Sequence, residues 1–168
     1  MSFTDNPTPK LKNPHVLFLS LFGVGFCPWA PGTVASLVSL PLFFVLSKLN
    51  IPFIFFLPPI ILLSVASSFS ANWAQNYYKS FDPSWIVIDE FLGLFVAFLF
   101  LLNDHFIHLF ILFGLFRFFD IFKIWPIYLI DQKIKHGAGV ILDDLLAGVF
   151  AGIVYRLICY WHLIPKLS

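Results

Sequence analysis

The sequence predicts an all-α protein: a multi-pass transmembrane helical bundle with short or kinked helices and a polar site at its cytoplasmic end. Three observations support this prediction. The 168-residue chain is 60% hydrophobic and only 11% charged, whereas roughly 25% of the residues in a soluble domain are charged. Its long apolar runs do not alternate with period two, as half-buried strands would. Its few acidic residues gather near the ends of those runs.

The composition also excludes several classes of protein. A chain with 10 basic and 9 acidic residues cannot cover the surface of a soluble enzyme, and its hydrophobicity is atypical of a disordered tail. A formal net charge of +1 gives no electrostatic footprint for DNA or RNA, so we expect no nucleic-acid partner. Cys27 and Cys159 lack the spacing of a disulfide framework or a zinc site. The expected partners are membrane lipids.

The chain divides into a polar, Pro-rich N-terminal segment, residues 1–14, and a single membrane domain, residues 15–168. The apolar runs expected to be helical are His15–Phe26, Val34–Leu49, Ile51–Ser70, Ile86–Leu102, Phe106–Phe122 and Leu145–Leu163. The turn signals between them are Pro31-Gly32-Thr33, Asn50 with Pro52, Asp82-Pro83, Asn103-Asp104 and His136-Gly137. Several runs are shorter than the ~20 residues of a full span. Pro41 and the Pro58-Pro59 pair are expected to kink two of them.

Alternation of helix direction places the basic side chains mainly at one end. If Val34–Leu49 leaves the cytoplasm and each later run reverses, seven basic residues face the cytoplasm and two face the opposite side. The cytoplasmic set is Lys10, Lys12, Lys79, Arg117, Lys123, Lys133 and Lys135, and the opposite set is Lys48 and Lys166. This distribution follows the positive-inside rule and predicts a site that faces the cytoplasm.

The same alternation brings five carboxylates to the cytoplasmic face. They are Asp89 and Glu90 at the start of the third long run, Asp120 near the end of the fourth, and Asp143 and Asp144 before the fifth. Adjacent like charges in apolar surroundings are costly without a cation, and carboxylate oxygens are ligands that Mg²⁺ prefers. We therefore interpret the two acidic pairs as a metal site. The alternative is that acids at helix N-termini only complement the helix dipole.

Small residues share helix faces with these acids. Gly93 lies four residues after Asp89, and Gly148 and Gly152 lie four and eight residues after Asp144. Residues at this spacing lie on one side of a helix, and small side chains let neighbouring helices approach closely. We expect the packed interface between these helices to carry the acids at its cytoplasmic end.

Basic residues beside the acids are candidates for binding phosphate. Arg117, Asp120 and Lys123 are spaced at i, i+3 and i+6, which places them on one broad helix face. Arg117 can pair with Asp120 while Lys123 reaches toward a headgroup or a phosphate. The alternative is a structural ion pair and a lysine that snorkels to the membrane surface. A metal ion together with a cationic side chain is the combination that phosphoryl transfer needs.

Two further segments contribute candidate residues. The rigid segment Gly25–Thr33 leads directly into a helix, and free amides there predict an anion site that includes Thr33. A Pro-Gly turn with Thr33 as the helix N-cap would look the same. His136–Gly139 is expected to be a flexible loop before Asp143. In that loop His136 is a candidate general acid or substrate contact, or a histidine without a chemical role.

Four segments in this order resemble the phosphatidylglycerophosphatase A family of bacterial membrane phosphatases. They are Gly25–Leu37 (GFCPWAPGTVASL), Ile86–Gly93 (IVIDEFLG), Phe116–Pro126 (FRFFDIFKIWP) and His136–Gly148 (HGAGVILDDLLAG). The resemblance covers nearly the whole chain. It implies Mg²⁺ as cofactor and phosphatidylglycerophosphate as substrate, which is converted to phosphatidylglycerol and phosphate in phospholipid synthesis. It also implies a place in the bacterial cytoplasmic (inner) membrane.

The resemblance assigns site roles to particular positions of this chain. They are Asp89, Glu90, Arg117, Asp120, Lys123, His136, Asp143 and Asp144. We expect the two acidic pairs to hold one or two Mg²⁺ ions, with Asp120 as another ligand or as the partner of Arg117. Lys123, and with it Arg117, would bind phosphate. Either a metal-activated water attacks phosphorus or a phospho-aspartate forms, and His136 would protonate the leaving glycerol oxygen.

Two other classes of protein remain as alternatives. A small ion transporter would also carry paired acids in helices, but near the middle of the membrane rather than at one face. A structural membrane subunit would have no reason to collect five acids on one side. Other phosphatase chemistries lose their required residues, because the sequence contains no Asp-x-Asp and neither cysteine is followed by arginine six residues later.

Overall fold

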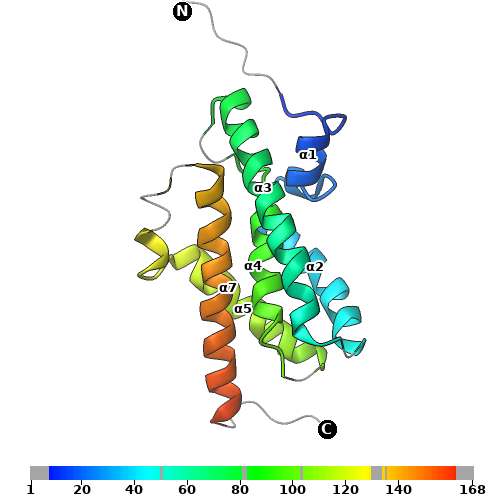
Figure 1. Cartoon of the computed structure of the whole chain (residues 1–168), viewed down its shortest axis with the longest axis vertical. Coiled ribbons are helices and arrows are strands. Elements are labelled where there is room, and N and C mark those ends of the chain that lie inside the picture. Colours follow the sequence, from blue (N-terminus) through cyan, green and yellow to red (C-terminus); the bar gives the residue numbers. More distant parts are fainter. Residues whose placement is uncertain are drawn as a thin grey trace, which may run out of the picture.

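A computed structural model describes residues 8–49, 51–80, 83–102, 104–129, 134 and 136–161. Within these residues all regular structure is helical and no strand occurs, which confirms the all-α prediction. Helices α3 (Leu57–Tyr78), α4 (Ile88–Phe98) and α7 (Gly137–Tyr160) lie roughly along the long axis of the molecule, and α5 (Phe106–Phe122) crosses obliquely (Figure 1). The short helix α1 (Pro14–Leu19) packs against α3 toward one end.

Successive helices of the bundle run in opposite directions. Their bounds are α2 (Pro31–Lys48), α3 (Leu57–Tyr78), α4 (Ile88–Phe98), α5 (Phe106–Phe122) and α7 (Gly137–Tyr160), with 3-10 turns η1 (Val24–Phe26) and η2 (Phe53–Phe56). The first residues of α2, α4 and α7 therefore lie toward the end of the molecule at which α3 and α5 finish (Figure 1). This is the alternation expected from the sequence. Three of the basic residues used to assign orientation, Lys133, Lys135 and Lys166, lie outside the described residues.

Among the described residues, three stretches are long and apolar enough to cross a membrane: Pro31–Lys48, Phe53–Tyr78 and Gly137–Tyr160. They turn large apolar side chains outward, as Leu62 (70% exposed) and Phe69 (73% exposed) of α3 illustrate. Such exposure is costly in water and is expected where lipid covers the surface. The chain is therefore a membrane protein by composition and by the character of its outer surface.

The interior of the bundle is filled by aromatic rings around α4. The ring of Phe43 on α2 lies 5.5, 5.2 and 5.3 Å, centroid to centroid, from those of Phe91, Phe95 and Phe98 on α4. Most residues of this 11-residue helix are buried. At the end opposite the acids, Lys48 pairs with Asp104 at 2.6 Å, and this hydrogen bond lowers the pKa of the Asp104 carboxyl.

The first apolar run does not form the single helix that was expected over His15–Phe26. Helix α1 ends at Leu19, because Leu21, Phe22 and Gly23 adopt positive φ values of 49°, 57° and 99°. A right-handed helix cannot continue through these conformations. The chain instead turns back through η1 toward the start of α2.

The runs Ile51–Ser70 and Ile86–Leu102 also differ from the prediction. Pro58 and Pro59 do not kink a helix; they stand in the first turn of α3, where a missing N–H costs no helical hydrogen bond. This helix continues past the predicted end at Ser70 to Tyr78. Helix α4 is shorter than the predicted run Ile86–Leu102, whereas α5 has the predicted bounds, Phe106–Phe122.

The last helix begins earlier than expected, at Gly137 rather than at Leu145. The predicted loop His136–Gly139 is therefore wrong, since His136 is the N-cap residue and the glycines form the first turn. The Gly137 N–H donates to Asn72 Oδ1 of α3 at 2.7 Å, and a Cβ on Gly137 would collide with the α3 backbone. Packing against α3 thus overrides the low helix propensity of glycine.

Candidate active site

Charged side chains from three helices meet in a cavity of about 380 Å³, next to the first turn of α2. The charged residues that line it are Asp89 and Glu90 of α4, Arg117, Asp120 and Lys123 at the end of α5, and Asp143 and Asp144 of α7. Antiparallel packing makes these positions neighbours although they are spread over 56 positions of the sequence. The structure thus brings together seven of the charged residues that the sequence predicted for the site.

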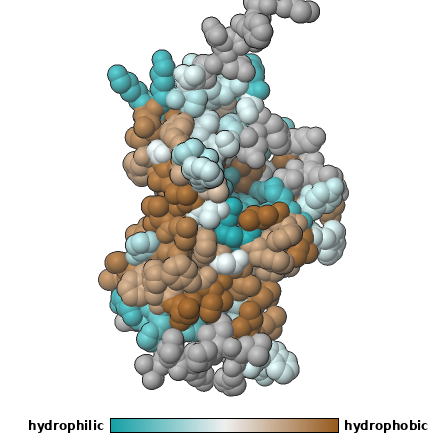
Figure 2. Space-filling view, turned by 180° about the vertical axis from the view of Figure 1, so that it is seen from behind, coloured by the Kyte–Doolittle hydropathy of each residue, from teal (hydrophilic) through white to brown (hydrophobic). Residues whose placement is uncertain are grey.

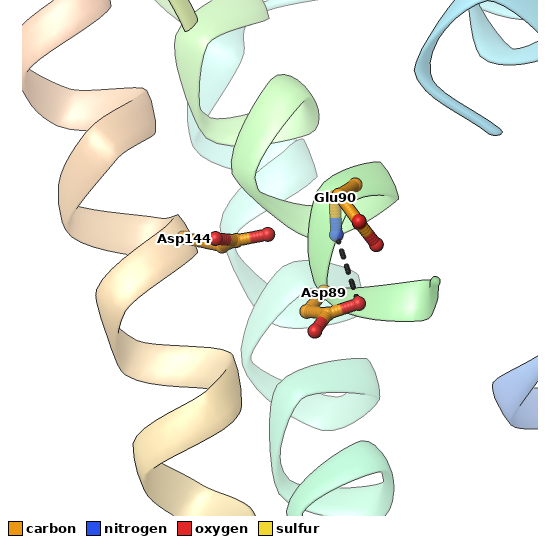
Figure 3. Close-up of side chains that lie close together, drawn as sticks. All are labelled: Asp89, Glu90 and Asp144. Carbon is orange, nitrogen blue, oxygen red and sulfur yellow. Dashed lines mark hydrogen bonds between the residues drawn. The ribbon is translucent and has the colours of Figure 1, made fainter. Parts of the chain in front are cut away.

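Three of the acids form the tightest group in the cavity. One carboxylate oxygen from each of Asp89, Glu90 and Asp144 can be chosen so that all lie within 4.8 Å of one another. Asp144 projects from α7 toward the first turn of α4, which carries the other two (Figure 3). Asp89 and Asp144 are only 7% and 4% exposed. We call these three residues the acid cluster.

The acid cluster is held together by contact between two glycines. A Cβ on Gly148 of α7 would collide with the carbonyl oxygen of Gly93 on α4, and a Cβ on Gly93 would lie 2.6 Å from the Asp144 carbonyl oxygen. Both glycines stand one turn beyond an acid of the cluster. The prediction that small residues would let these helices approach, with the acids at the end of the interface, is confirmed.

Glu90 lies against the first turn of α2. A Cβ on Gly32 would collide with the Glu90 carboxylate, so only glycine leaves room for this side chain. The α2 N-cap residue, Ala30, adopts a left-handed φ of 42° and supplies no side-chain cap. The N-terminus of a helix carries partial positive charge, which suits a carboxylate there. Glu90 Oε2 is buried and has no hydrogen-bond partner among the described residues.

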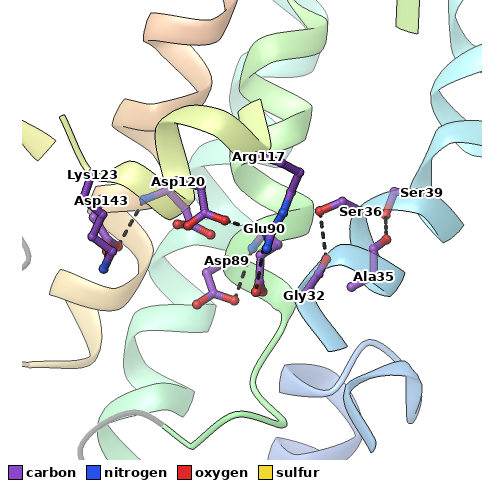
Figure 4. A network of polar contacts seen from close by, with 11 residues as sticks. Gly32, Ala35, Ser36, Ser39, Asp89, Glu90, Arg117, Asp120, Lys123 and Asp143 are labelled. Carbon is purple, nitrogen blue, oxygen red and sulfur yellow. Dashed lines mark hydrogen bonds and ion pairs between the residues drawn. The ribbon is translucent and has the colours of Figure 1, made fainter. Parts of the chain in front are cut away.

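Arg117 joins α5 to the acid cluster. Its Nη1 lies 2.5 Å from Asp120 Oδ2 and 3.9 Å from Glu90 Oε1 (Figure 4). The predicted i, i+3 pair of Arg117 and Asp120 is therefore confirmed. Both side chains are largely buried, at 15% and 13% exposed, so this pair is screened less by water than a surface ion pair. It fixes the guanidinium at the wall of the cavity.

Lys123 and Asp143 form a second ion pair across the cavity. Lys123 Nζ donates to Asp143 Oδ2 at 2.8 Å, which links the end of α5 to α7 (Figure 4). Lys123 is the residue at which α5 ends, with a left-handed φ of 42°. Asp143 was predicted to be a metal ligand with Asp144, but it is not part of the acid cluster, and its carboxylate contacts a lysine.

The donor set of the acid cluster suits a hard divalent cation. The cavity is lined by five carboxylates and two basic side chains, and buried like charges repel one another unless a cation offsets them. Mg²⁺ binds oxygen ligands at about 2.1 Å, so opposite ligands of one ion lie about 4.2 Å apart, close to the spacing of these carboxylates. Glu90 Oε2, which is buried and has no hydrogen-bond partner in the described part of the chain, offers an acceptor for such an ion.

Two predicted site residues do not line the cavity. Thr33 is in the first turn of α2, but the helix starts at Pro31 with Ala30 as N-cap, so the interpretation of Thr33 as N-cap is wrong. His136 is exposed and directly precedes α7. The roles proposed for both residues stay predictions.

Several lining residues were not named individually as site residues in the sequence analysis. They are Ala30, Pro31, Gly32, Ser84, Ile86, Ile121 and Val140. The first three belong to the segment predicted as an anion site, and their proximity to Glu90 follows only from the packing of α2 on α4. Ile121 and Val140 carry no chemical signal, so only the fold could place them here.

Known sequences match this chain over most of its length. The sequence model of the family described as Phosphatidylglycerophosphatase A matches residues 17–159. Proteins named phosphatidylglycerophosphatase A from Escherichia coli and Haemophilus influenzae are 30% and 35% identical to this chain; the matches cover 92% and 95% of it, and 89% and 98% of those proteins. A Bacteroides thetaiotaomicron protein, provisionally named a phosphatidylinositol-3-phosphatase, is 36% identical over 83% of this chain and 89% of its own length. No solved structure gives a significant match.

Proposed function

The chain belongs to the phosphatidylglycerophosphatase A family and is a phosphatase, and from this premise we propose that it hydrolyses phosphatidylglycerophosphate with the help of Mg²⁺. The products would be phosphatidylglycerol and inorganic phosphate, in bacterial phospholipid synthesis. The observation that carries this proposal is the acid cluster beside Arg117 and Lys123 in one cavity.

Each charged group of the cavity has a task in this proposal. Asp89, Glu90 and Asp144 would hold the metal ion, which when bound neutralises negative charge on the phosphoryl group. Lys123 and Arg117 would donate hydrogen bonds to the phosphate oxygens that remain. Asp120 keeps Arg117 in place through their ion pair, and Asp143 does the same for Lys123. Asp143 retains its predicted role as a metal ligand only if its carboxylate turns from Lys123.

We also propose that the protein crosses the bacterial cytoplasmic membrane several times, with the cavity facing the cytoplasm. Among the described residues, Lys79 directly follows α3, and Arg117 and Lys123 lie at the end of α5, which is the cavity end; Lys48 ends α2 and Arg156 is near the end of α7, which is the opposite end. An excess of lysine and arginine marks the cytoplasmic side. In a variant without native cysteines, Lys79→Cys should react with a membrane-impermeant maleimide in inverted vesicles and stay unlabelled in intact spheroplasts.

A direct assay tests the proposed reaction. Protein purified in detergent micelles, stripped with a chelator and supplied with phosphatidylglycerophosphate should release phosphate only after Mg²⁺ is restored. Phosphatidylinositol-3-phosphate belongs in the same assay, because one relative carries that name. Activity that survives complete chelation would contradict the proposed dependence on Mg²⁺. A preference for phosphatidylinositol-3-phosphate would contradict phosphatidylglycerophosphate as the proposed substrate.

The ion-transporter alternative has weaker support. A transport site is expected near the middle of the membrane. The acid cluster lies instead where α2 and α4 begin and where α5 approaches its end. Arg117 and Lys123 beside the acids also suit a phosphate better than a small cation in transit.

A further inference from the structure

The cavity has a buried floor and an exposed rim. Asp144 and Asp89 on its floor are 4% and 7% exposed, whereas Ile121, which also lines it, is 63% exposed. Ala30, on the α2 side, is exposed as well. Ile121 therefore marks the mouth of the cavity. Figure 2 shows hydrophilic surface in a hollow on the side of the molecule, bordered by hydrophobic surface.

The interior beyond the acid cluster is closed to a lipid chain. Helices α4 and α7 are in backbone contact at Gly93 and Gly148, and the ring of Phe116 on α5 also packs against Gly93. Phe116 is fully buried, and the ring of Phe43 lies 5.5 Å from that of Phe91 on the α2 side of α4. An acyl chain could pass between these helices only by separating them. The hydrophobic part of the substrate must therefore stay outside.

A continuous apolar stripe runs from the mouth along the outer face of α5. Its members are Ile107, Phe110, Gly114, Phe118 and Ile121, and the four large side chains are 48%, 43%, 46% and 63% exposed. Their spacing of i, i+3, i+7, i+11 and i+14 puts them on one helix face. We call this face the α5 stripe. Ile121 belongs both to the stripe and to the cavity.

Gly114 makes a notch in the middle of the α5 stripe. It is exposed, and a Cβ placed on it would meet no atom within 4 Å. It lies between Phe110 and Phe118, so bulky rings border a gap without a side chain. The notch is seven residues, or about 10 Å along the helix axis, from Ile121. This distance suits the upper part of an acyl chain whose headgroup is in the cavity.

We propose that one acyl chain of the substrate lies along the α5 stripe across Gly114, and that only the phosphorylated headgroup enters the cavity, past Ile121. This inference rests on the proposed lipid phosphatase function and specifies how the lipid is bound. The bound acyl chain covers the α5 stripe in place of bulk lipid, and it fixes the direction in which the headgroup points. Ile121 then separates the polar and apolar parts of the substrate, and the lipid reaches the site sideways from the bilayer.

The notch can be filled without disturbing the fold. Gly114→Phe adds a ring where the structure leaves open space, and it also replaces glycine in a helix interior, where glycine is unfavourable. We compare kcat/KM for phosphatidylglycerophosphate with two long chains and with two six-carbon chains, both in the same detergent. The ratio of long-chain to short-chain kcat/KM should fall about tenfold, because several methylene contacts are lost. Leu62→Phe, on the outer face of α3 away from the cavity, is the matched control and should keep the wild-type ratio.

A second measurement does not depend on turnover. A phosphatidylglycerophosphate with a diazirine at mid-chain should, on illumination, label wild-type protein within residues 110–121, and Gly114→Phe should reduce this labelling. Labelling confined to α3 or to core residues such as Phe95 would overturn the inference. An unchanged ratio of long-chain to short-chain kcat/KM in Gly114→Phe would also overturn it. So would cross-links between two copies of the protein through α5. If wild type is labelled on α5 but releases no phosphate, the proposed reaction fails and the binding mode stands.

Discussion

Gly93 of α4 and Gly148 of α7 touch through their backbones, one helical turn beyond Asp89 and Asp144 respectively. Because the two helices are closest at this point, carboxylates one turn away face each other across a short gap. The spacing of the acid cluster, within 4.8 Å, is thus a consequence of two residues that have no side chain. Any group larger than hydrogen at either position must move a helix.

Enlarging this contact should therefore damage both stability and activity. Gly148→Val places two methyl groups against the Gly93 carbonyl, and overpacking of this kind costs about 1–3 kcal/mol. We expect a lower midpoint of thermal unfolding in detergent and a loss of phosphate release. Ile153→Val, on the exposed side of α7, is the control and should change neither. A fully active Gly148→Val protein would show that the glycine contact does not set the site.

The acid cluster should be indispensable for phosphate release. Asp89→Asn and Asp144→Asn each remove one charged oxygen ligand while keeping the shape of the side chain, and we expect kcat/KM to fall at least about 100-fold. Asp104→Asn is the matched control, since this carboxylate pairs with Lys48 at the opposite end of the bundle. Near-wild-type turnover in both cluster variants would remove these residues from the proposed site.

The dependence of activity on Mg²⁺ should separate Asp143 from its neighbours. Asp143 Oδ2 pairs with Lys123 Nζ, and Asp143 is not one of the three acids of the cluster. We therefore expect Asp143→Asn to lower activity but to keep the wild-type half-saturating Mg²⁺ concentration. A conservative change in the cluster, Glu90→Asp, should raise that concentration roughly 10-fold or more. If Asp143→Asn shifts the Mg²⁺ dependence as strongly as Glu90→Asp, then Asp143 is a ligand, as the sequence first indicated.

Gly32 should act through Glu90. A Cβ at residue 32 would collide with the Glu90 carboxylate, so Gly32→Ala must displace that side chain, and phosphatase activity should fall. The two residues are in contact, so their effects should be non-additive. In a Glu90→Gln background, which is already impaired, Gly32→Ala should cause little additional loss. If the fold-loss of phosphatase activity in the double variant equals the product of the two single-variant fold-losses, Gly32 matters for another reason, such as the start of α2.

Binding of the phosphate by Lys123 predicts a particular kinetic pattern. Lys123→Met keeps most of the length of the side chain but removes the charged donor, and charge-assisted hydrogen bonds are worth about 1.5–3 kcal/mol. We expect kcat/KM to fall by roughly 10- to 100-fold. A rise in added salt should weaken substrate binding less in this variant than in wild type. Unchanged kinetics in Lys123→Met would limit Lys123 to its structural pair with Asp143.

Much of the fold followed from composition and local pattern. The length of the apolar runs and the scarcity of charge are sufficient to predict helices in a membrane, and α5 has the bounds read from the sequence, Phe106–Phe122. Helix direction follows from chain connectivity, so the meeting of acids from α4, α5 and α7 at one end was also predictable. The resemblance in four ordered motifs identified the family that the comparisons confirm.

The errors in the helix bounds occurred where tertiary contacts override local preference. Gly137 and Gly139 predict a loop by propensity, yet they form the first turn of α7, because Asn72 of α3 accepts a hydrogen bond from the Gly137 N–H. Asp143 and Asp144 are adjacent in sequence, but successive residues of a helix point about 100° apart. One of them therefore turns to Asp89 and Glu90 while the other turns to Lys123.

The sequence by itself thus determined which residue types gather and at which end of the bundle they do so, since both depend on hydrophobicity and chain direction alone. Only the tertiary structure decided which carboxylates form the cluster, that Gly32 makes room for Glu90, and that Ile121 stands at the mouth above a notch at Gly114. These relations depend on the distance and rotation of one helix relative to another. Both are set by contacts between residues far apart in the chain.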